Sequence, residues 1–116
     1  MAKMKIRVLI ETSSIKQKIT PTAIYQDEIL KYQEEDKTKV ILNLKNYSLT
    51  RENDKMKMYY LFQKDKETLG KIKIKEYDKN IDIKIKTQKL ERKKNNIEII
   101  YIIENEKFLY KIEEIK

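Results

Sequence analysis

Apolar and charged residues alternate along most of this chain. The alternation is clearest in KIKIKEYDKNIDIKIKT, residues 71–87, where isoleucines and charged residues alternate on both sides of a turn. Successive side chains of a β-strand point to opposite faces of a sheet, so the pattern predicts strands with one apolar and one solvated face. Two segments contain helix formers, residues 26–36 and 54–69, but both keep the strand alternation. We therefore predict an all-β protein.

Hairpin turns can be placed by requiring that the apolar faces of neighbouring strands match, because a slip of one residue would invert every side chain. The predicted turns are Gln26-Asp27, Lys45-Asn46, Asn53-Asp54, Asp78-Lys79 and Asn105-Glu106. The resulting cross-strand pairs are Leu42–Leu49, Val40–Arg51, Arg51–Met56, Leu49–Met58, Ile74–Ile83, Tyr101–Tyr110 and Leu109–Ile102. Residues 19–25 are predicted as one strand, and the first strand supplies Ile6, Val8 and Ile10 to the apolar face.

The chain of 116 residues has the size of one domain, so we predict a single domain over residues 1–116. An antiparallel meander of about eight to ten strands tends to curl, and closure removes the exposed edges of the sheet. The expected architecture is a small closed antiparallel β-barrel with an apolar interior.

Composition removes the common forms of catalysis. The chain has no cysteine and no histidine, which excludes disulfides, thiol chemistry and an imidazole base. Its serines therefore lack an activating imidazole, and one glycine cannot make a glycine-rich phosphate loop. We predict no enzymatic activity, no catalytic residues, no metal site and no cofactor.

The net charge of +8 comes mainly from lysine, with 24 lysines and three arginines. A predicted outer stripe consists of Lys73, Lys75, Lys84 and Lys86. These lysines are interpreted as a solvating coat, with nucleic acid as a less favoured partner, because no aromatic residue lies among them. The apolar run at the start is too short for a signal peptide and no segment resembles a membrane span, so we expect a cytoplasmic protein without a membrane partner.

Arg51 is the most unusual residue of the predicted inner face. The register places it beside apolar side chains near one end of the barrel, where an unpaired charge would be costly. Glu34, with the parity of Leu30 and Tyr32, is the predicted partner. The pair is interpreted either as a structural ion pair or as a group that receives a carboxylate or phosphate of a ligand.

Four tyrosines share this inner face, namely Tyr47, Tyr60, Tyr101 and Tyr110. They are either core aromatics with satisfied hydroxyls or the lining of a pocket. On the outer face, Ile100, Ile102 and Leu109 lie where charge is expected, and they are the candidate surface for a homodimer.

The order of these segments resembles the YwiB-like family, a bacterial domain of unknown function with a calycin-like β-barrel fold. The matching stretches are KYQEED, KVILNLKNYSLTREND, MKMYYLF, IKIKT (residues 83–87), IEIIYIIEN and FLYKIEEI. Where the family usually has glycine in the turn before an isoleucine-rich strand, this chain has Asp78-Lys79-Asn80. The resemblance implies an interior that could hold a ligand, as in lipocalins and fatty-acid-binding proteins, and it brings no established ligand or reaction.

Together these patterns favour a non-enzymatic calycin-like barrel that binds a small amphipathic or anionic ligand inside. The ligand-binding candidates are Glu34, Tyr47, Arg51, Tyr60, Tyr101 and Tyr110. The alternatives are a nucleic-acid-binding module with a basic surface and a structural protein that self-associates.

Overall fold

The computed structural model describes residues 2–115, which form one antiparallel sheet of eleven strands. The strands are β1 (Ala2–Glu11), β2 (Lys16–Ile19), β3 (Thr22–Gln26), β4 (Ile29–Gln33), β5 (Lys39–Asn43), β6 (Ser48–Glu52), β7 (Met56–Leu61), β8 (Glu67–Ile74), β9 (Lys79–Lys93), β10 (Asn96–Ile103) and β11 (Glu106–Ile115). Within these residues no helix is long and apolar enough to cross a membrane.

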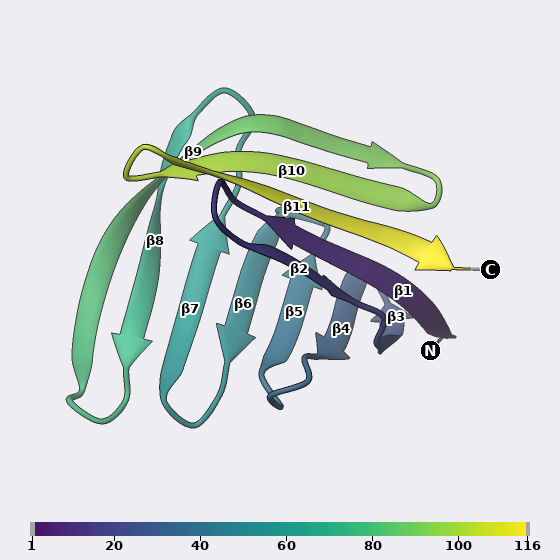
Figure 1. The fold of residues 1–116 in the computed structure, drawn as a ribbon, viewed down its shortest axis with the longest axis horizontal. Helices are drawn as coiled ribbons and strands as arrows, with labels where there is room; N and C mark the ends of the chain where they lie inside the picture. The colour runs from purple at the N-terminus through teal and green to yellow at the C-terminus, as the bar shows by residue number, and fades with distance from the viewer. Residues whose placement is uncertain (1, 116) are drawn as a thin grey trace.

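The sheet closes because β11 pairs with β1, so the first and last strands lie side by side (Figure 1). From β3 to β11, each strand pairs with the next along the chain. The predicted closed antiparallel barrel is confirmed, with ten strands in the ring and β2 as an additional strand.

The other edge of β1 is shared between two strands. Residues 2–5 pair with β3 and residues 8–11 pair with β2. The single strand predicted over residues 19–25 is therefore wrong, because it is interrupted between Ile19 and Thr22. Pro21 lies in the break, and proline has no N–H to donate to a strand ladder.

The long strand β9 connects two layers of the barrel. Figure 1 shows β1, β10 and β11 running at a steep angle to β4–β8, with β9 bending from one layer into the other. The register between β9 and β10 shifts between Ile100 and Tyr101, which marks a β-bulge on β9. A bulge of this kind lets one strand turn the corner between nearly orthogonal layers.

Side chains alternate between the interior and the solvent as the sequence predicts. In β5, Val40 and Leu42 are fully buried while Ile41 is exposed. Ile6 and Val8 of β1 are buried, and Ile10 packs against the core. The core of the barrel is therefore drawn from the predicted inner face.

The predicted register is confirmed for one hairpin and wrong for four others. The pairs Leu42–Leu49 and Val40–Arg51 are present. Elsewhere the partners differ from those predicted: the observed pairs are Gln26–Ile29, Arg51–Met58, Leu49–Tyr60, Ile74–Lys79, Gly70–Ile83, Tyr101–Phe108, Ile99–Tyr110 and Ile100–Leu109. Each error is a shift of two or four residues, so every side chain keeps its predicted face.

Turn chemistry explains these shifts. Asp27 and Glu28 both have positive φ, as do Glu104 and Asn105, so these pairs are the centres of their turns. Between β6 and β7, the Asn53 Oδ1 atom accepts hydrogen bonds from the N–H groups two and three residues later, at 2.8 and 3.0 Å. This Asx-turn moves the turn centre one residue beyond the predicted position.

The turn also explains the register shift in the hairpin between β8 and β9. Here a four-residue turn occupies residues 75–78, and positive φ falls on Asp78. The Asp78 N–H donates to the Lys75 carbonyl at 3.3 Å and closes this turn, so β8 ends at Ile74, earlier than predicted.

Gly70 of β8 provides a test of the packing. A Cβ atom at this position would lie 2.8 Å from both the Tyr59 carbonyl oxygen and Ile85 Cδ1. Because the Tyr59 contact is with backbone, relief requires movement of a strand. We expect Gly70→Ala to lower the free energy of unfolding by about 1–3 kcal/mol in urea denaturation.

The control is Leu69→Ala, at a neighbouring outer position that is 62% exposed. It should change stability by no more than about 0.5 kcal/mol. Equal stability of the Gly70→Ala and wild-type proteins would contradict this account of the packing.

Candidate functional site

Arg51 of β6 and Glu34, just after β4, form an ion pair inside one end of the barrel. An Arg51 Nη2 atom lies 2.5 Å from Glu34 Oε1. The Glu34 side chain is only 4% exposed, whereas that of Arg51 is 30% exposed. The predicted pairing of these two residues is therefore present in the structure, with the carboxylate as its buried member.

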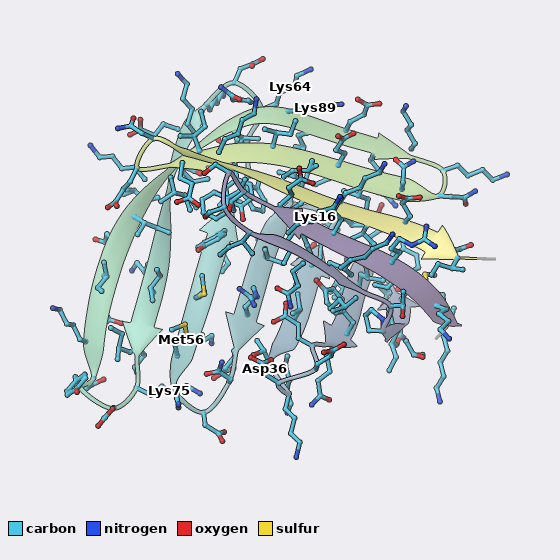
Figure 2. The ribbon with its side chains drawn as sticks, in the orientation of Figure 1. Lys16, Asp36, Met56, Lys64, Lys75 and Lys89 are labelled. Atoms are coloured by element: carbon cyan, nitrogen blue, oxygen red, sulfur yellow. The ribbon has the colours of Figure 1, made fainter. Side chains whose placement is uncertain are left out.

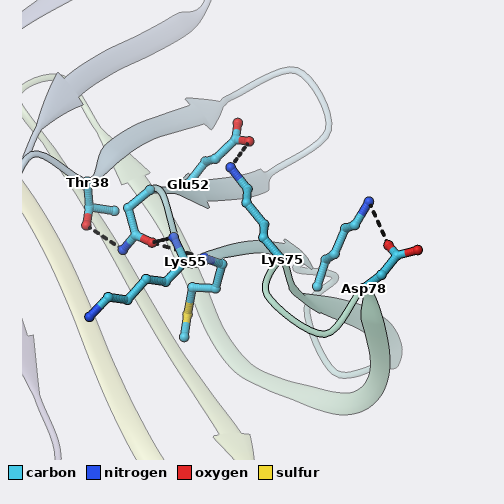
Figure 3. Close-up of polar contacts among 8 residues, drawn as sticks. Thr38, Glu52, Lys55, Lys75 and Asp78 are labelled. Carbon is cyan, nitrogen blue, oxygen red and sulfur yellow. Dashed lines mark hydrogen bonds and ion pairs between the residues drawn. The ribbon is translucent and has the colours of Figure 1, made fainter.

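A tight loop holds Glu34 in place. Its N–H donates to the Thr38 carbonyl at 2.9 Å, and its carbonyl accepts from the Lys37 N–H at 2.9 Å. Lys37 has φ of 70°, which lets the chain reverse within a few residues. The Thr38 hydroxyl in turn accepts a hydrogen bond from the Asn53 side chain at 3.2 Å (Figure 3). The loop and the β6–β7 turn are thus tied together beside the ion pair.

The ion pair leaves two buried polar atoms without a partner. Glu34 Oε2 and Arg51 Nε are both buried, and neither has a hydrogen-bond partner among residues 2–115. An unsatisfied buried polar group costs stability, and a charged one costs more than a neutral one. This end of the barrel therefore has unused capacity to accept and to donate a hydrogen bond.

Four buried tyrosines surround the pair. The hydroxyls of Tyr32 and Tyr110 are 2.6 Å apart and share a hydrogen bond. Tyr60 and Tyr101 contact each other edge to face, with ring centroids 6.0 Å apart, and Tyr101 also stacks on Phe108 at 5.1 Å. These rings come from β4, β7, β10 and β11, so the site depends on closure of the barrel.

The tyrosines and the ion pair line a cavity of about 120 Å³. Its walls are formed by Ile10, Tyr32, Glu34, Leu49, Arg51, Met58, Tyr60, Tyr101, Phe108 and Tyr110. For comparison, an apolar cavity of about 150 Å³ binds benzene. The cavity can therefore hold a group of a few heavy atoms, with aromatic walls and one polar end.

Burial controls the ionisation of this cluster. It raises the pKa of the phenols of Tyr32, Tyr60, Tyr101 and Tyr110 above the usual value of 10.0, although the charge of Arg51 opposes the shift in each case. Burial lowers the pKa of Arg51, but the hydrogen bond and negative charge of Glu34 together outweigh it, and the pKa lies above its usual value. At neutral pH the four phenols are uncharged and Arg51 is a cation.

Five of the six candidate residues meet in this cavity. Tyr47 does not join them, because it lies in the turn between β5 and β6, at the end of β6 remote from Arg51. The sequence analysis missed Tyr32 as a site residue, although its parity with Leu30 and Glu34 could have indicated it.

A second cavity of about 160 Å³ lies at the other end of the barrel, beside the β9–β10 turn. Its most basic wall is made by Arg92, Lys93 and Lys94, all of which are exposed. Arg92 already binds Glu28 and the Tyr25 hydroxyl, each at 3.1 Å. The residues that line this second cavity include none of those with a buried polar atom that lacks a hydrogen-bond partner. We therefore place the candidate site at the Arg51 end.

The other surface candidates have the following positions. Ile100 and Leu109 are cross-strand neighbours, and Ile102 pairs with Lys107. The side chains of Ile100, Ile102 and Leu109 are half-buried. A homodimer through these three residues stays a prediction. In the outer lysine stripe, Lys75 binds Glu52 at 2.8 Å and Lys73 binds Asp78 at 3.5 Å (Figure 3). Within residues 2–115, no group of three acidic side chains could hold a metal ion.

Removing one member of the ion pair should destabilise the barrel. In Arg51→Met the buried Glu34 carboxylate loses its cation, and we expect the free energy of unfolding to fall by about 3 kcal/mol. The double variant Glu34→Leu/Arg51→Met should recover most of this loss, since two apolar side chains need no desolvation. Urea denaturation measures both.

The matched control for this pair is Lys75→Met, which breaks the exposed pair with Glu52. It should cost less than about 1 kcal/mol. A double variant as unstable as Arg51→Met alone would show that the loss does not come from the unpaired carboxylate.

Alkaline pH should destabilise the protein through the buried tyrosines. Because their pKa values are raised on folding, the folded state keeps protons that the unfolded state releases. Their contribution is complete below pH of about 10 and is lost as pH rises further. Denaturation midpoints should fall above pH of about 10, with a shallower fall in Tyr32→Phe/Tyr110→Phe.

Tyrosinate absorbance gives an independent measurement. The four buried phenols should ionise only when the protein unfolds. Ionisation of all tyrosines in one step while the protein stays folded would contradict the burial of these hydroxyls.

Comparison with known proteins gives a likeness of fold. No family model matches the sequence, and no curated protein matches it. The crystal structure of the YwiB protein from Bacillus subtilis is similar, with a TM-score of 0.58 and 14% sequence identity over 98% of this chain and 91% of that chain. The predicted resemblance to the YwiB-like family is thus confirmed at the level of the barrel fold.

Proposed function

We propose that this protein binds a small uncharged amphipathic molecule in the cavity at the Arg51 end of the barrel. The observation that carries the proposal is the buried Glu34 carboxylate, which has one oxygen without a hydrogen-bond partner beside a cavity of about 120 Å³. Small barrels are usually filled by their own side chains, so a cavity lined by residues that carry unsatisfied polar atoms supports a site for another molecule.

Charge balance favours an uncharged ligand over the anionic one considered from the sequence. Glu34 already neutralises Arg51, so a bound anion would bring an uncompensated negative charge next to a buried carboxylate. A bound cation would meet the same difficulty at Arg51. A group that both donates and accepts hydrogen bonds, such as a primary amide, would supply partners for Glu34 Oε2 and Arg51 Nε without adding charge.

The basic surface gives less support to a nucleic-acid-binding function. Two of the four lysines in the outer stripe, Lys73 and Lys75, are each within an ion pair with a carboxylate. Nucleic-acid binding depends on cations that are free to replace the counterions of phosphates. The interior site therefore remains the better-supported hypothesis.

Three probes of similar size test the proposal. Butanamide, butyrate and butylamine differ in head-group charge, and their binding can be followed by chemical-shift titration of the labelled protein. We expect saturable shifts at cavity residues with butanamide, and an affinity at least about tenfold weaker for either ion, which is the ratio that 1.4 kcal/mol of uncompensated charge produces.

Two variants locate the binding. Glu34→Gln should weaken butanamide binding, whereas Glu52→Gln, on the outside of the same end, should leave it unchanged. Absence of butanamide binding would overturn the proposed function, and tighter binding of butyrate would overturn the uncharged ligand.

A further inference from the structure

The inner face of β7, β8 and β9 continues past the closed part of the barrel. Strand β9 pairs with β10 only from Lys86 to Lys93, so residues 79–85 have β8 on one edge and no strand on the other within the described chain. Figure 1 shows the lower ends of β7–β9 extending well beyond the β10–β11 hairpin. The interior is therefore open at this end, on the side of β7–β9.

This uncovered face is apolar. Six side chains have the parity of the interior and are only half-buried or exposed; together they form what we term the apolar shelf: Met56, Met58, Ile72, Ile74, Ile81 and Ile83. Cross-strand pairing joins Met56 to Ile74, and Met58 through Ile72 to Ile81. On the opposite face of the same strands the side chains are mostly charged, as is typical of a face in contact with solvent. The apolar shelf does not have this composition, which indicates that it contacts something other than water.

Most of the apolar shelf lies outside the core. Met58 and Ile83 pack against the buried cluster, whereas Met56, Ile72, Ile74 and Ile81 do not. Met56 is 37% exposed, and Figure 2 shows it near the open end of β7. These side chains therefore have apolar surface left to bury.

The apolar shelf is continuous with the cavity through Met58. This residue lines the cavity and is the cross-strand neighbour of both Arg51 and Ile72. The cavity of about 120 Å³ holds only a few heavy atoms. When the polar head of a molecule occupies the cavity, the rest of the molecule must therefore extend out of it. Because Met58 borders both the cavity and Ile72, atoms that extend past it would reach the isoleucine side chains of the apolar shelf.

We propose that the ligand is a long-chain amphipathic molecule with an uncharged head, such as a fatty amide or alcohol, whose tail lies on the apolar shelf. This inference rests on the proposed function, because the cavity must first hold the head. A second copy of the chain is the weaker candidate for covering this face. The free edge of β9 carries Asp82 and Lys84, and charged side chains on an edge strand oppose pairing with another strand.

A homologous series of primary amides, from butanamide through hexanamide and octanamide to decanamide, tests the tail. Titration of the labelled protein should give an affinity that rises about two- to fourfold for each added CH₂, the increase expected for burial of a methylene group. The rise should level off once the tail has covered the pair Met56–Ile74. An affinity independent of tail length would overturn the role of the apolar shelf and leave the cavity site standing.

Variants on the two faces of β8 and β9 separate the contribution of the apolar shelf to tail binding from that of the outer face. Ile72→Thr/Ile81→Thr keeps β-branched side chains, so it should preserve the strands and the affinity for butanamide while removing most of the gain from longer tails. Leu69→Thr, on the outer face of β8, should retain the full gain. If both variants behave alike, the tail does not lie on the apolar shelf.

Sedimentation of the wild-type protein tests whether a second copy of the chain covers the apolar shelf. A dimer that Ile72→Thr/Ile81→Thr converts to monomers would show that a second copy covers this face, and would overturn the inference. Failure of butanamide itself to bind would instead remove the proposed function, and the inference with it.

Discussion

The closed ring imposes one constraint on which the rest of the molecule depends: every second side chain of each strand must enter the same interior. Alternation along β5, β8 and β9 satisfies it with isoleucine, leucine and valine. The few polar residues with inward parity must then find partners inside. Arg51 is the clearest case, because its guanidinium on the inner face of β6 is paired with the Glu34 carboxylate. This ion pair forms the polar end of the cavity.

This constraint also explains which features of the fold could be predicted from the sequence. The inner face was predicted correctly even where hairpin partners were wrong, because the apolar pattern constrains only the parity of each strand. In the β8–β9 hairpin, for example, Ile74 pairs with Lys79 and not with Ile83, yet both isoleucines keep the inward parity. Register depends on turns whose centre needs positive φ, and without glycine such a turn has no strong mark in the sequence.

The candidate site was predictable to the same extent. Parity alone placed Glu34 and Arg51 together, since both lie near the same end of β4 and β6, the two strands that flank β5. It could not separate Tyr47 from the other tyrosines, because Tyr47 lies in a turn where φ is 56° and alternation no longer applies. The cavity depends on packing across the ring, between β4, β7, β10 and β11, which no pattern within a single strand contains.

The pairing of β1 with β11 has a consequence for the order of folding. Lys5 lies opposite Ile115, so the seam joins residues from the two extremes of the described chain. Contacts so distant in sequence carry a large loop-closure entropy, and proteins dominated by them fold slowly. The hairpins from β4 to β8 can form locally, but the interior stays open to water until β11 reaches β1. Closing this seam should therefore be a late and slow step, and intermediates that precede it expose the apolar face.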